Sequence, residues 1–156
     1  MVRKVLVCLD GSCFAEQVLP FAADLASCSG ASVVLLQVRG TPTPISTLPG
    51  PVVGAAYTKA VQEAQRDNEQ RVTAYLQDKA GPLQQRGIDV EVVSIEGEAG
   101  DAIVNYAREN RVNLIAMATR GHSRLRRLLF GSVADYVVRE SGLPVLIVSS
   151  AQVQVQ

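Results

Sequence analysis

Residues 112–150 read VNLIAMATRGHSRLRRLLFGSVADYVVRESGLPVLIVSS and hold two continuous apolar runs on either side of a stretch with helical periodicity. The runs at 112–118 and 144–150 are short and rich in valine, leucine and isoleucine, which is typical of strands that are buried on both faces. The stretch between them, at about 131–141, is expected to be a helix. A strand, a helix and a second strand in this order indicate a βαβ unit with parallel strands.

The same alternation continues through the rest of the chain. Further strands are expected at 4–10, 32–38 and 88–95, and further helices at about 13–28, 56–86 and 99–110. Pro82 lies within the long helix at 56–86 and is expected to break or kink it, so that a short separate helix starts near Pro82. The pattern as a whole predicts an α/β fold, with a five-stranded parallel sheet and helices on both of its faces.

Composition indicates one soluble domain without a strong overall electrostatic field. A length of 156 residues with 47% hydrophobic content suits a single domain at 1–150 with a C-terminal tail at 151–156. Fifteen basic and fifteen acidic residues leave no net charge, so neither nucleic acid nor a membrane is expected as a partner. The apolar runs are much shorter than the roughly 20 residues that span a bilayer, and no signal peptide is recognised. We expect a cytoplasmic protein with reduced cysteines at Cys8, Cys13 and Cys28.

One segment departs from the alternation of strands and helices. Residues 40–54, GTPTPISTLPGPVVG, contain four of the seven prolines and are expected to form a surface loop. Two interpretations stay open: a tolerated insertion, or a lid over a ligand.

Two strand ends carry the residues with distinctive chemistry. The first strand ends in CLDGS, which places Asp10 at the carboxyl edge of the sheet, and the fourth ends at Ala118 and leads into the basic stretch up to Ser132. Ligands of open α/β sheets bind at that edge, near the point where the strand order reverses. If the two strands are neighbours, Asp10 and residues 118–132 face one crevice.

The glycine-serine pair at the end of the basic stretch suggests an anion site. The amides of Gly131, Ser132 and Val133 at the start of a helix have no intrahelical partners and lie at the positive end of the helix dipole. Gly121 permits close backbone approach, and Arg120 and Arg124 are candidate charge partners of a phosphate.

A simpler interpretation of the same residues stays open. Gly131 then only relaxes a turn, Ser132 is a helix N-cap, and the arginines are solvated. Asp10, which has the right chemistry to accept hydrogen bonds from ribose hydroxyls, has its own alternative as a cap of the following helix, a role that Ser12 fits equally.

Several common catalytic and nucleotide signatures are absent from the sequence. The chain has no G-x-x-x-x-G-K-[ST] and no G-x-G-x-x-G after its first strand, which disfavours a P-loop NTPase or a dinucleotide dehydrogenase. The single histidine, His122, has no G-x-S-x-G elbow beside it, and no cysteine pair has zinc-site spacing. No catalytic residue and no protein-held metal are therefore predicted.

The spacing Ala118, Gly121, nine residues, Gly131-Ser132 resembles the G-x-x-G-x9-G-[ST] signature of the universal stress protein family. The resemblance extends over essentially the whole chain, from KVLVCLDGS through GEAGDAIVNYARENRVNLIAMATRG to the last strand. It implies a Rossmann-like fold of the adenine nucleotide alpha hydrolase type, and a homodimer formed through the last strand at 144–149.

In the ATP-binding branch of that family, the resemblance implies a role for each matching residue. Asp10 contacts the ribose, Val38 and Met117 border the adenine, and the phosphates, with Mg²⁺, are held by the loop that contains the residues Ala118, Gly121, Gly131, Ser132 and Val133. The implied function is that of an ATP-binding regulatory protein of the stress response.

Two departures from the family pattern bear on this function. Ala118 stands where the signature has its first glycine, and Cys8, interpreted as a packing residue, stands where some ATP-binding members have proline. The alternatives are a nucleotide-free dimeric interaction module and a slow ATPase. The sequence does not decide among ATP, ADP and AMP.

Overall fold

The computed structural model describes residues 1–41, 54–120 and 131–150. The proline-rich segment from 42 to 53, the middle of the basic stretch and the C-terminal tail lie outside the described residues. Within the described part, all pairings of the sheet are parallel, in the order β3-β2-β1-β4-β5. The strands are β1 (Lys4–Leu9), β2 (Ser32–Arg39), β3 (Val90–Glu96), β4 (Leu114–Arg120) and β5 (Val145–Ser150). The predicted α/β fold with a five-stranded parallel sheet is confirmed.

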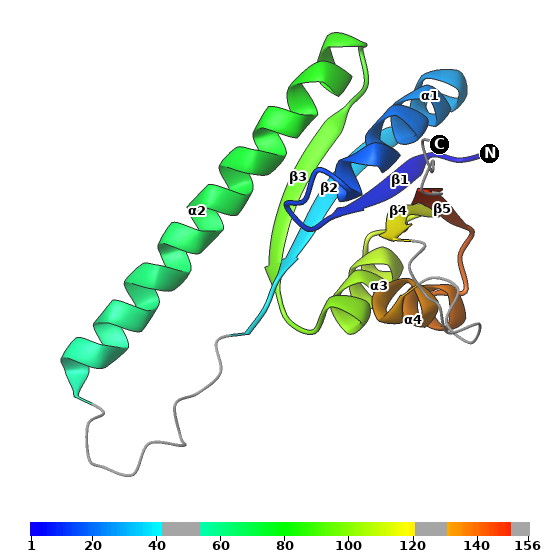
Figure 1. The fold of residues 1–156 in the computed structure, drawn as a ribbon. Coiled ribbons are helices and arrows are strands. Elements are labelled where there is room, and N and C mark those ends of the chain that lie inside the picture. Colours follow the sequence, from blue (N-terminus) through cyan, green and yellow to red (C-terminus); the bar gives the residue numbers. More distant parts are fainter. Residues whose placement is uncertain (42–53, 121–130, 151–156) are drawn as a thin grey trace, which may run out of the picture.

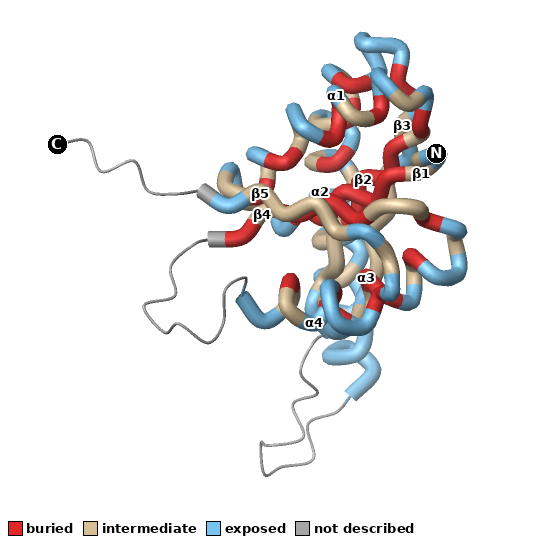
Figure 2. Tube along the Cα trace, turned by 90° about the vertical axis from the view of Figure 1, so that its right-hand side faces the viewer, coloured by how far each residue is buried: buried red, intermediate tan, exposed pale blue. Residues whose placement is uncertain are grey.

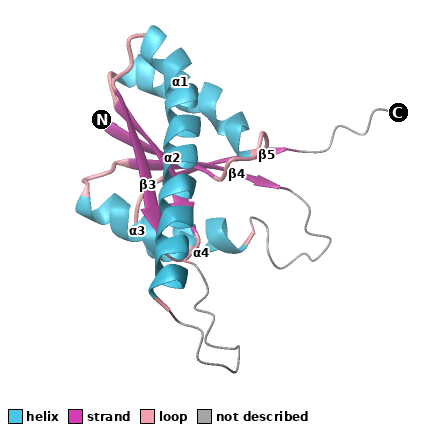
Figure 3. Ribbon diagram, turned by 90° about the vertical axis from the view of Figure 1, so that its left-hand side faces the viewer, coloured by secondary structure: helices cyan, strands magenta, loops and turns pink. Residues whose placement is uncertain are grey.

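Helices cover the two faces of this sheet (Figure 1). One face packs against η1 (Ala15–Val18), α1 (Leu19–Ser29) and α2 (Ala55–Gln85), and the other against α3 (Ala99–Glu109) and α4 (Ser132–Glu140). Figure 3 shows α2 crossing its face of the sheet. Among the described residues, no helix combines the length and the apolar character needed to cross a membrane.

The continuous apolar strands follow from this two-sided cover. Val5 and Val7 of β1 pack into the core beneath α1 and α2, whereas Leu6 and Cys8 pack into the core beneath α3 and α4. Successive side chains of a strand point to opposite faces, so both sets must be apolar. Figure 2 shows the buried residues gathered along these central strands. Each fully buried valine or leucine contributes about 1.5–3 kcal/mol to folding.

The strand order creates the crevice expected at the carboxyl edge. From β1 the chain proceeds outward to β2 and β3 on one side, then returns to place β4 and β5 on the other. β1 therefore pairs with β4 directly, with Val5 opposite Leu114 and Val7 opposite Ala116. The assumption that these strands are neighbours is confirmed, and their ends lie at the reversal point where ligands of such sheets bind.

The predicted break at Pro82 is wrong. α2 continues through Pro82 and ends at Gln85, so the proline occupies the last turn of the helix. There Pro82 removes one backbone hydrogen-bond donor from the last turn. Ala80 and Leu83, on either side of it, are both buried in the core. Packing on either side of Pro82 holds the final turn helical.

The expected helix at 13–28 is also corrected. The structure has the short 3-10 helix η1 first, and α1 begins at Leu19 with Pro20 in its opening turn, where a proline needs no donor.

Candidate functional site

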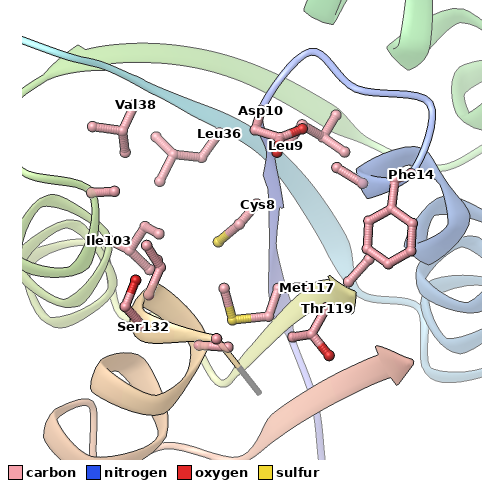
Figure 4. A pocket seen from close by; sticks show the side chains of 16 residues that line it. Cys8, Leu9, Asp10, Phe14, Leu36, Val38, Ile103, Met117, Thr119 and Ser132 are labelled. Carbon is pink, nitrogen blue, oxygen red and sulfur yellow. The ribbon is translucent and has the colours of Figure 1, made fainter. Parts of the chain in front are cut away.

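A cavity of about 320 Å³ opens at the carboxyl ends of β1, β2 and β4 (Figure 4). The turn after β1 borders it on one side, and the first residues of α3 and α4 border it on another. It is lined by Cys8, Leu9, Asp10, Phe14, Ala15, Leu36, Val38, Ala99, Ile103, Met117, Ala118, Thr119, Gly131, Ser132, Val133 and Ala134.

Most of the residues singled out in the sequence meet at this cavity. Gly121 and Arg124 lie outside the described residues, and Arg120 is described only as the last residue of β4, where it pairs with Ser150. His122 is likewise outside the described residues. The predicted site residues that line the cavity are Asp10, Val38, Met117, Ala118, Gly131, Ser132 and Val133.

Asp10 has a local structural role and one oxygen to spare. Its Oδ1 accepts hydrogen bonds from the backbone amide of Ser12, at 2.9 Å, and from the Ser12 hydroxyl. Ser12 Oγ in turn accepts a hydrogen bond from the amide of Ala15, the first residue of η1, at 3.1 Å. The alternative role of Ser12 as a cap is therefore seen in the structure, with Asp10 orienting the hydroxyl. Asp10 Oδ2 makes no hydrogen bond with the described residues, and the side chain is exposed.

The start of α4 presents backbone donors to the cavity. Gly131 is the N-cap residue, with φ +78° and ψ 162°, and its carbonyl accepts the amide of Asp135 at 3.0 Å. Ser132 is the first helical residue and not the N-cap, and no side chain of the described residues caps α4. The amides of Ser132 and Val133 therefore have no acceptor within the helix and lie at the positive end of its dipole.

An apolar wall joins these two polar ends. Figure 4 shows Cys8, Ile103 and Met117 between Asp10 and Ser132, with Leu36 and Val38 beside them on β2. Burial raises the pKa of the Cys8 thiol to about 12, so Cys8 is a neutral part of this wall at physiological pH. This agrees with its interpretation as a packing residue.

The model of the Universal stress protein family matches residues 1–149. The chain belongs to the universal stress protein family. Universal stress protein YxiE of Bacillus subtilis is 31% identical to it over 149 residues, which is 95% of this chain and 99% of YxiE.

Solved structures of this family share its fold. A universal stress protein in complex with cAMP has a TM-score of 0.68 at 23% identity, and the match covers 96% of this chain and 98% of that chain. A universal stress protein family protein from Arabidopsis thaliana with AMP bound has a TM-score of 0.62 at 14% identity, with 96% and 93% of the two chains covered. At these identities the likeness establishes the fold.

Several lining residues of this universal stress protein were not singled out in the sequence. Leu36 lies two residues before Val38 and so shares its face of β2, a signal that strand periodicity does contain. Thr119 likewise lies two residues after Met117 on β4, whereas Phe14 carries no such signal. Thr119 is only 5% exposed, and its Oγ1 has no hydrogen-bond partner among the described residues, so a polar group is buried at the cavity wall.

Proposed function

We propose that this universal stress protein binds an adenine nucleotide, with ATP as the predicted ligand, in the cavity at the ends of β1, β2 and β4. Nucleotide occupancy then alters its shape or choice of partner in a stress response. The observation that carries the proposal is that three environments line one cavity: an apolar wall, a carboxylate whose Oδ2 makes no hydrogen bond with the described residues, and a helix N-terminus.

Each environment suits one part of a nucleotide. The apolar side chains of Val38 and Met117 offer a surface for a purine base. Asp10 Oδ2 can accept hydrogen bonds from ribose hydroxyls, since Oδ1 already serves the turn. The amides of Ser132 and Val133, which have no acceptor within α4, can donate to phosphate oxygens. Magnesium would arrive with the phosphates and neutralise part of their charge.

The Ala118 methyl group is compatible with this arrangement. Ala118 is a regular residue of β4, paired with Val148 of β5, so its position requires no special backbone conformation. Its side chain packs against the core beneath η1, α1 and α2, on the face of the sheet opposite to Met117, so the methyl group that replaces the first signature glycine has a place in that core. The solved relatives with cAMP and AMP support an adenine nucleotide as the ligand class.

Calorimetric titration of the nucleotide-stripped protein with Mg-ATP tests the proposal. We expect micromolar or tighter binding at about one site per chain, weaker binding of GTP, and loss of binding in Gly131→Trp. Gly54→Trp is the matched control, because Gly54 is also a helix N-cap glycine but lies away from the cavity, at the start of α2. Absence of binding heat at several temperatures, with an unchanged melting temperature, would contradict the proposal.

We propose further that two copies pair through β5, as the family resemblance implies for 144–149. β5 is an edge of the described sheet and pairs only with β4 there. An edge strand leaves backbone groups open to a second strand. Light scattering should give the mass of a dimer, and Ser149→Pro, at an exposed position of β5, should shift it toward monomer while Ser149→Thr does not. A monomeric wild-type protein at tens of micromolar would reject the dimer.

A further inference from the structure

Glu16 connects the turn after β1 to the long helix α2. Tyr75 of α2 donates a hydrogen bond from its hydroxyl to Glu16 Oε1 at 3.0 Å, and Lys79 Nζ lies 3.2 Å from Glu16 Oε2. Tyr75 and Lys79 are four residues apart and so share one face of the helix. Lys79 Nζ also lies 5.6 Å from the centre of the Tyr75 ring, within cation–π range. Both carboxylate oxygens of Glu16 are therefore held by one helical face.

The anchoring of Glu16 continues into the cavity wall. The amide of Glu16 donates to the carbonyl of Ser12 at 3.4 Å, and Ser12 is bonded through its amide and hydroxyl to Asp10. Phe14 and Ala15, between Ser12 and Glu16, line the cavity itself. An unbroken series of contacts thus runs from α2 through Glu16 to the carboxylate of Asp10.

The turn has little stability of its own. η1 contains only four residues, and a 3-10 helix of this length is held mainly by its surroundings. Two of its residues, Ala15 and Val18, are buried and fix one side. The side that bears Glu16 is fixed by the contacts with Tyr75 and Lys79.

We propose that Tyr75, Lys79 and Glu16 form a brace that positions the Asp10 turn for ligand binding. The proposal rests on the proposed nucleotide function, which it deepens by assigning roles to residues outside the cavity. None of the three lines the cavity, so they are positioning residues. Loosening the brace should weaken those ligand contacts that Asp10 makes and leave the contacts with the base and phosphates unaffected.

The test compares brace variants with matched changes on the same helix. Tyr75→Phe, Lys79→Met and the double variant remove the contacts with Glu16. Tyr57→Phe and Lys59→Met make the same chemical changes near the start of α2, and Tyr57 is about 27 Å from Tyr75 along the helix axis. Lys59 contacts Glu63 of its own helix and is largely exposed. Titrations use Mg-ATP and Mg-2′,3′-dideoxy-ATP, which lacks the ribose hydroxyls.

We expect the double variant to bind ATP about tenfold more weakly than the wild type and to bind the dideoxy analogue with less than a twofold change. The control variants should match the wild type for both ligands. In an Asp10→Asn background the brace mutations should have little further effect, because the contact that they position is already altered. An equal loss for both ligands, or unchanged ATP binding, would overturn the brace.

A measurement on the free protein separates the brace from the proposed function. Amide hydrogen exchange over residues 10–18 should be faster in the double variant than in the wild type or the control variants. If the wild type binds no adenine nucleotide, the proposed function fails, and faster exchange would still support positioning of the turn. Unchanged exchange would overturn the brace whatever the wild type binds.

Discussion

Asp10 and Ser132 line the same cavity, although Asp10 follows β1 and Ser132 begins α4. They line one cavity because β1 pairs with β4, and α4 begins beside the same edge of the sheet. The carboxylate and the positive end of α4 thus stand apart across an apolar wall.

Substitution of Asp10 should distinguish its two roles. Asp10→Ala removes both the ligand contact and the acceptor that orders Ser12, and we expect it to weaken ATP binding by about 1.5–3 kcal/mol. Asp10→Asn keeps an oxygen for the Ser12 amide, so it should preserve the melting temperature while still reducing affinity. Calorimetry and thermal unfolding measure the two effects. An unchanged affinity in a folded Asp10→Ala protein would remove Asp10 from the site.

Replacing Gly131 with any residue that has a side chain should lower the stability of the fold, because of the backbone conformation at this position. With φ +78° and ψ 162°, Gly131 occupies a region that is almost restricted to glycine, and Gly131→Ala should cost about 1–3 kcal/mol of unfolding free energy. Gly54→Ala is the control, because Gly54 is an N-cap glycine with φ −87°, and at both positions an added Cβ has no heavy atom of the described residues within 4 Å. Urea unfolding of the two variants tests the prediction, and equal effects would show that backbone strain is not the cause.

The parallel sheet and the residues at both ends of the cavity could be predicted from the sequence, but the strand neighbours could not. Continuous valine and leucine runs identified the parallel sheet, because only strands covered on both faces need them. Periodicity does not determine which strands are neighbours, so the position of Asp10 and Ser132 on one cavity follows only from the pairing of β1 with β4. Residue spacing then located both ends of the cavity.

The features that escaped prediction depend on contacts between distant residues. Pro82 was expected to end a helix on local grounds, but the burial of Leu83 overrides that preference. The contact of Tyr75 with Glu16 joins two helices that the sequence separates widely, and no local pattern marks it. The buried hydroxyl of Thr119 is similarly invisible until β4 is placed against its neighbours.

The three cysteines should differ in reactivity. Burial raises the pKa of the Cys8 thiol from 9.0 to about 12, whereas Cys13 and Cys28 are exposed. At pH 8 the thiolate fraction of Cys8 should be roughly a thousandfold smaller in the folded than in the unfolded protein, since each pKa unit is a factor of ten. Iodoacetamide labelling followed by peptide mass analysis should modify Cys13 and Cys28 first, and Cys8 only in urea.

The raised pKa of Cys8 also determines whether stability rises or falls with pH. Above pH 9 the unfolded chain releases the Cys8 proton while the folded chain retains it, so this contribution to stability is lost as the pH rises from about 9 to 12. Cys8→Ala should therefore show a shallower decline over that range than the wild type. Rapid labelling of Cys8 in the native protein at pH 8 would contradict both expectations.

Gly100 and Tyr136 set the spacing between α3 and α4. A Cβ atom added at Gly100 would lie 2.6 Å from Cδ1 and 3.0 Å from Cγ of the Tyr136 ring, so the ring would have to move. The Tyr136 hydroxyl is also hydrogen-bonded to Asp101 of α3, which resists that movement. Gly100→Ala should consequently destabilise the fold by about 1–3 kcal/mol, although alanine is the better helix former.

A double-mutant cycle assigns this cost to the contact with the ring. In a Tyr136→Ala background the added methyl group meets no ring, and Gly100→Ala should become neutral or stabilising by up to about 1 kcal/mol. Gly81→Ala is the control, because Gly81 lies inside α2 and the substitution there would bring the added Cβ within 4 Å of no heavy atom from other described elements, so the change should stabilise the wild type. Urea unfolding of the four proteins of the cycle gives the coupling energy. Additive effects of the two substitutions would mean that the ring yields freely, and that the approach of the two helices is set elsewhere.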